Sequence, residues 1–149
     1  MRPRRLILLV SSSENILADR GFMLDTRGFK TLRANSAAVA IEIFCARRVD
    51  VVVIDLDLGA GLGDRDGRWL VDELRTVSKP MLADVPMILV SAITESGSIA
   101  HPADCFLGKG HCAPIDLFEW VKAMSTRKRG PRKKPPLPVL PAEGMAAIA

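Results

Sequence analysis

The stretch Asp50-Val-Val-Val-Ile-Asp55 decides the fold of this chain, because it sets four consecutive apolar residues between two carboxylates. An uninterrupted apolar run of this length, within the predicted strand Val49–Asp55, is typical of a strand buried on both faces of a parallel sheet. Helices must then cover the sheet on both sides. The last residue of the run, Asp55, is expected at the carboxyl end of the sheet, where α/β proteins place their functional groups.

Other apolar runs along the chain predict four more strands, separated by segments with helical spacing. The predicted strands are Arg5–Val10, Phe29–Ala34, Val49–Asp55, Met87–Val90 and Cys105–Leu107. The first predicted helix starts at Glu14, and the second runs over Ala37–Arg47 with Asn35 or Ser36 as its cap. The third carries Trp69, Leu70, Leu74 and Val77, and the last starts at Pro114. A further helix over Ile93–Ala103 is expected to be short or irregular, because it contains Gly97 and Pro102.

This alternation predicts an α/β fold of (βα)5 order, a doubly wound parallel sheet with helices on both faces. Polar side chains follow the strands at several of their carboxyl ends. They are Ser11, Ser12, Asp55, Ser91 and Lys109. We expect the functional site among them.

The chain has 149 residues, 48% of them hydrophobic and 26% charged, which suits one folded domain with a short tail. No apolar run reaches the roughly 18 residues that a membrane-spanning helix needs. Cys45, Cys105 and Cys112 form an odd set without a C-x-x-C pair, which does not suggest a disulfide framework. We therefore expect a protein of the reducing cytoplasm.

The net charge of +4 is unevenly distributed. Residues 127–149 hold six Lys/Arg, one Glu and five of the ten prolines, so that residues 1–126 are nearly neutral. We expect domain 1–126 to be folded and the basic, Pro-rich tail 127–149 to be disordered. The tail suits contact with an anionic surface, but without interleaved aromatic residues or a following helix-turn-helix it does not indicate specific DNA binding.

Over about residues 5–126 the chain resembles the receiver domain of two-component response regulators. Asp50–Asp55 resembles the third strand that ends in the phosphoacceptor aspartate, and Asp66-Gly67 resembles the dipeptide that opens the third helix. Val90-Ser91-Ala92 resembles the end of the fourth strand, and Phe106-Leu-Gly-Lys109 the fifth strand with its lysine. The resemblance implies a flavodoxin-like sheet of strand order 2-1-3-4-5.

The resemblance also implies a function: phosphorelay signal transduction without enzymatic activity, with Asp55 as phosphoacceptor. A nucleophilic carboxylate must be accessible and flanked by cations, and Lys109 and the Ser91 hydroxyl suit the oxygens of a phosphoryl group. Phe106 would act as the switch residue, filling space that opens when Ser91 moves inward. The implied partners are a histidine kinase or phosphotransfer protein and a downstream protein reached by direct contact.

Several features depart from the family pattern. Ser11 and Ser12 stand where receivers usually carry two adjacent acids, which leaves Asp55, the backbone carbonyl of Asp57 and water as a weak Mg²⁺ site. The loop after Asp55 is about four residues longer than usual, and the segment from Ser91 to Phe106 is about four residues shorter. Gly110 replaces the proline that usually follows the lysine.

These departures keep alternatives open. One alternative is a degenerate interaction module that works without phosphorylation. Another is a flavodoxin-like enzyme, which is poorly supported because no cofactor loop is present. A metal site made of His101, Cys105, His111 and Cys112 has spacing unlike common zinc modules; Cys105 suits a buried strand and His111 an exposed loop. The Gly59–Gly63 loop lacks the Lys-Ser/Thr of a nucleotide-binding loop.

Overall fold

Five parallel strands form one sheet in the computed structural model, which describes residues 4–58, 66–77, 85–95 and 100–126. The strands are β1 (Leu6–Val10), β2 (Lys30–Ala34), β3 (Val51–Asp55), β4 (Met87–Val90) and β5 (Cys105–Leu107). The sheet order is β2-β1-β3-β4-β5, which confirms the predicted order 2-1-3-4-5.

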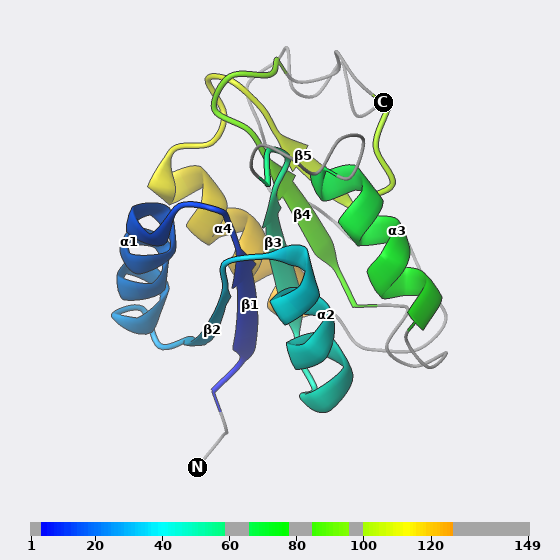
Figure 1. Cartoon of the computed structure of the whole chain (residues 1–149). Helices are drawn as coiled ribbons and strands as arrows, with labels where there is room; N and C mark the ends of the chain where they lie inside the picture. The colour runs from blue at the N-terminus through cyan, green and yellow to red at the C-terminus, as the bar shows by residue number, and fades with distance from the viewer. Residues whose placement is uncertain (1–3, 59–65, 78–84, 96–99, 127–149) are drawn as a thin grey trace.

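Four helices in the described ranges cover the sheet. They are α1 (Glu14–Asp25), α2 (Ala37–Ala46), α3 (Gly67–Val77) and α4 (Pro114–Ser125). Figure 1 shows α1 and α4 on one face of the sheet and α2 and α3 on the other. The flavodoxin-like, doubly wound α/β fold is therefore confirmed.

The central strands supply residues to two separate cores, one on each face of the sheet. On the α2–α3 face, Val52 and Ile54 of β3 pack in a cluster with Phe44 and Leu70. On the other face, Val51 and Val53 pack in a cluster that includes Trp120 of α4. All four residues of the apolar run are fully buried, which is why it shows no polar alternation.

The pairing of β1 with β3 is held at both ends. At the start, the Asp50 backbone N–H donates to the Leu6 carbonyl at 2.7 Å, and the Leu6 N–H donates to Asp50 Oδ2 at 2.8 Å. At the end, Val10 pairs with Ile54. Asp50, the first carboxylate of the Asp50–Asp55 stretch, thus helps to fix the register between β1 and β3. Asp55, the second carboxylate, lies beside the end of β1.

Side-chain caps begin three of the helices. Ser13 Oγ accepts a hydrogen bond from the Ile16 N–H at the start of α1, and Ser36 Oγ accepts one from the Val39 N–H at the start of α2, each at 3.3 Å. Asp66 Oδ1 accepts hydrogen bonds from the N–H groups of Arg68 and Trp69. Helix α4 begins instead with Pro114 in its first turn.

Parts of the sequence prediction need correction or lie outside the described residues. No helix occurs in residues 91–95 or 100–104, so the short helix predicted over Ile93–Ala103 is not found there; residues 96–99 are not described. The Gly59–Gly63 loop and the tail 127–149 also lie outside the described ranges. Among the helices that the structure describes, none is both long and apolar enough to cross a membrane.

Helix α3 begins in direct backbone contact with the end of β3. Gly67 is buried, and its N–H donates to the Leu56 carbonyl at 2.7 Å. A Cβ atom at this position would clash with the Asp55 carbonyl oxygen and lie 2.9 Å from Leu56 Cα. Only glycine fits between α3 and the end of β3, which explains the Asp66-Gly67 pair at this point in the chain.

We predict that Gly67→Ala destabilises the fold by about 1–3 kcal/mol, because backbone atoms must move to admit the methyl group. Gly21→Ala is the matched control: the three atoms nearest its Cβ would all belong to the guanidinium group of Arg33, an exposed and flexible side chain. That variant should be neutral or more stable by up to about 1 kcal/mol, since alanine favours a helix interior. Urea unfolding measures both, and equal effects of the two substitutions would contradict this account.

Candidate functional site

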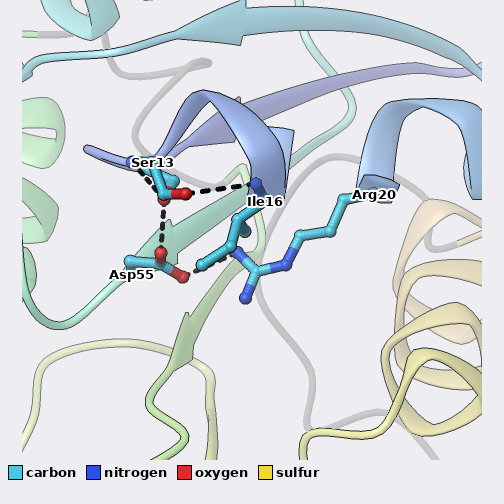
Figure 2. Close-up of polar contacts among 5 residues, drawn as sticks. Ser13, Ile16, Arg20 and Asp55 are labelled. Carbon is cyan, nitrogen blue, oxygen red and sulfur yellow. Dashed lines mark hydrogen bonds and ion pairs between the residues drawn. The ribbon is translucent and has the colours of Figure 1, made fainter. Parts of the chain in front are cut away.

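The Asp55 carboxylate is engaged on both of its oxygens. Ser11 Oγ donates to Oδ2 at 2.6 Å, and Arg20 Nη1 donates to Oδ1 at 2.6 Å in an ion pair. Figure 2 shows Arg20 reaching from α1 to this carboxylate. The Asp55 side chain is 13% exposed and the Arg20 side chain is 18% exposed, so the ion pair is partly shielded from water.

The local fold explains why these two donors meet the carboxylate. Ser11 directly follows β1 and is fully buried; its backbone N–H continues the ladder to the Ala34 carbonyl, and its Oγ also accepts from the Ser13 N–H. Arg20 lies on α1 between Leu17 and Leu24, two buried residues of the face that packs on the sheet. A side chain at the margin of that face is long enough to reach the strand ends.

Ser91 and Lys109 lie just past the ends of β4 and β5, the two strands that follow β3 in the sheet. Asp55 pairs with Val90, and Val90 pairs with Leu107, so the three strands end side by side. The Ser91 N–H donates to the Leu107 carbonyl at 3.0 Å. The polar side-chain contacts of Asp55 within the described ranges nevertheless go to Ser11 and Arg20, and Lys109 is exposed.

The Ser91 hydroxyl is buried and organises the segment after β4. Its Oγ accepts hydrogen bonds from the backbone N–H groups of Ile93 and Thr94 at 3.3 and 3.0 Å. The Thr94 carbonyl in turn accepts from the Lys109 N–H at 2.8 Å. These contacts use the hydroxyl as an acceptor and leave its own O–H free to donate.

Phe106 is already in an interior position. It is 8% exposed and belongs to the core on the α2–α3 face. The imidazole of His101 packs against its ring with the centroids 5.5 Å apart, and burial lowers the pKa of His101. The proposed switch residue thus has an inward conformation.

Comparison with solved structures decides the architecture. A two-component response regulator from Clostridium difficile has a TM-score of 0.69 at 21% identity, over 83% of this chain and 98% of that chain. The Vibrio cholerae chemotaxis protein CheY4 has a TM-score of 0.68 at 20% identity, over 82% of this chain and 99% of that one. The chain has the receiver-domain fold.

A receiver domain of a histidine kinase from Syntrophus aciditrophicus is similar to the same degree, with a TM-score of 0.68 and 24% identity over 82% of this chain and 90% of that chain. The sequence matches no protein-family model and no curated protein. At these identities the likeness establishes the receiver fold alone. Function must be argued from the site.

The magnesium ion implied by the receiver resemblance does not fit the residues present. Mg²⁺ prefers six oxygen ligands and is usually held through carboxylates. At the end of β1, Ser11 already donates its hydroxyl to Asp55, while Ser12 and Asp57 are exposed. The described residues contain no group of three His, Cys, Asp or Glu that could hold a metal ion. The positive group beside Asp55 is instead the Arg20 guanidinium.

Arg20 was missed by sequence reasoning, although a signal was present. It is a charged residue three positions after Leu17 and four before Leu24, on the margin of the apolar face of α1. With a helix that starts just after the end of β1, this position faces the carboxyl edge of the sheet. An arginine at such a position can carry its positive charge to the ends of the strands.

The cysteine and histidine residues near β5 form no group of three that could hold a metal ion within the described residues. Burial raises the pKa of the Cys105 thiol to about 12. His111, expected to be exposed, is buried, with 8% of its surface exposed. Its backbone N–H donates to the Gly108 carbonyl in the turn after β5. Cys45, Cys105 and Cys112 are free cysteines.

We predict a large difference in thiol reactivity between Cys105 and the exposed Cys45. A pKa of about 12 instead of 9.0 lowers the thiolate fraction at neutral pH by roughly a thousandfold, and burial also blocks access. Alkylation by iodoacetamide, followed by peptide mass analysis, should label Cys45 first and Cys105 only after unfolding. Equal labelling rates in the folded protein would contradict the buried position of β5.

Proposed function

We propose that the chain is a cytoplasmic receiver-type signalling module that accepts a phosphoryl group on Asp55 and transmits the change by protein contact. The observation that supports this most is the position of Asp55 in a receiver fold. It is a carboxylate at the carboxyl end of the central strand, with Ser91 and Lys109 just past the ends of the two following strands. Its partners would be a histidine kinase or phosphotransfer protein and a downstream protein.

In the proposed reaction, one Asp55 oxygen attacks the phosphorus of a phosphohistidine. An O–P bond forms, the P–N bond breaks, and its electron pair stays on the imidazole nitrogen, which takes up a proton. The attacking oxygen must first lose its contact with Ser11 or Arg20. Lys109 and the free O–H of Ser91 then have suitable chemistry to bind phosphoryl oxygens.

The output of this reaction would pass through the segment after β4. Ser91 holds the N–H groups of Ile93 and Thr94, so a Ser91 hydroxyl that turns toward a phosphoryl group weakens both contacts. Ile93, just after Ser91 in this segment, is 79% exposed. A change at Asp55 would thus move an apolar residue on the surface that a partner protein could contact.

A second candidate is a module that binds its partner without phosphorylation. Two observations favour it. Both Asp55 oxygens already have hydrogen-bond donors, and the Phe106 ring is already inward. A receiver fold with these contacts would present the same surface to its partner at all times.

Incubation with acetyl phosphate, read by intact mass, distinguishes the two candidates. We expect the parent protein to gain one phosphoryl group and Asp55→Asn to gain none. Asp72→Asn, which removes an exposed carboxylate on α3, should label like the parent. If the parent gains no phosphoryl mass, with or without Mg²⁺, the phosphoacceptor proposal is wrong and the constant module is favoured.

A further inference from the structure

We propose that Arg20 is the resident cation of the Asp55 site and takes the charge role of a divalent metal ion, so that phosphoryl transfer to Asp55 is independent of Mg²⁺. The inference rests on the proposed phosphorylation of Asp55, and it adds which group neutralises the negative charge at that site. It starts from the ion pair between Arg20 Nη1 and Asp55 Oδ1 at 2.6 Å.

The ion pair is built into the fold. Arg20 extends from a helix whose neighbouring positions, Leu17, Gly21 and Leu24, are buried against the sheet. Its side chain is 18% exposed, so water screens the pair less than a pair on the open surface. Ser11 supplies a second donor to the same carboxylate from the end of β1. The carboxylate therefore has a fixed positive partner before any donor arrives.

A divalent ion has no equivalent support at this place. The two residues after β1 are serines, and the hydroxyl of the buried one already donates to Asp55. An ion at the Asp55 oxygens would also be repelled by the guanidinium, which is within hydrogen-bond distance of Oδ1. Binding Mg²⁺ would require displacing Arg20 without any gain of carboxylate ligands.

The guanidinium is chemically suited to the arriving group. It carries five N–H donors in a planar fork, which matches carboxylate and phosphoryl oxygens, and the contact with Oδ1 uses Nη1 alone. With acetyl phosphate as donor, an Asp55 oxygen forms the O–P bond, the P–O bond to the acetyl group breaks, and acetate leaves with the electron pair. Arg20 and Lys109 are then positive groups available to the phosphoryl oxygens.

Phosphorylation with and without metal tests the assignment. Acetyl phosphate labelling of the parent, followed by intact mass over time, should proceed at the same rate in MgCl₂ and in EDTA. Arg20→Ala should slow labelling by roughly tenfold or more, the effect of losing a charged hydrogen bond, and Arg20→Lys should restore part of the rate. The control Arg48→Ala removes an exposed arginine ahead of β3, at the opposite end of that strand, and should leave the rate unchanged.

Calorimetric titration with MgCl₂ provides a second readout that does not depend on labelling. The parent should show no binding heat. The triple variant Ser11→Asp, Ser12→Asp, Arg20→Ala should bind Mg²⁺, and its labelling should then require the metal. Binding of Mg²⁺ by the parent, or labelling of the parent only in MgCl₂, overturns the assignment of Arg20.

The two proposals fail in different ways. Absence of labelling in every condition refutes phosphorylation of Asp55, and with it the role of Arg20 in transfer, whatever the titration shows. Labelling that depends on Mg²⁺ leaves Asp55 as the phosphoacceptor and refutes only the metal-independent chemistry. Labelling in EDTA that survives Arg20→Ala unchanged also refutes the role of Arg20.

Discussion

Val10 pairs with Ile54 in the parallel ladder between β1 and β3, and this register brings Ser11 beside Asp55 where both strands end. The same ladder is held at its start by the reciprocal hydrogen bonds of Leu6 and Asp50. A slip by one residue would turn every side chain of β3 to the opposite face and exchange the two cores. The register that buries Val51–Ile54 is thus also the one that assembles the carboxylate site.

Much of the architecture could be predicted because the strands are buried on both faces. Such strands appear as short continuous apolar runs, and helix caps such as Ser36 mark where the next helix begins. The segment after β4 could not be predicted with equal success. In residues 91–95, Ser91 Oγ accepts hydrogen bonds from the N–H groups of Ile93 and Thr94, and the spacing of apolar residues does not reveal such side-chain contacts.

The candidate site was predictable in position but not in its contacts. The strand pattern placed Asp55, Ser91 and Lys109 at neighbouring strand ends, as observed. The partners of the carboxylate are a side chain from α1, thirty-five residues earlier in the chain, and a serine where receiver domains usually carry an acid. Contacts of this kind follow from how a helix is seated on the sheet, which a single sequence does not specify.

The contact of Gly67 with the end of β3 has a mechanical consequence. Because not even a methyl group fits between the first residue of α3 and the Asp55 carbonyl, the two backbones form one stiff joint. Densely packed groups transmit a displacement instead of absorbing it. A shift of the main chain at Asp55 would therefore displace the first residues of α3 with it. Val77, the exposed apolar residue at the other end of this helix, would move as part of the same rigid element.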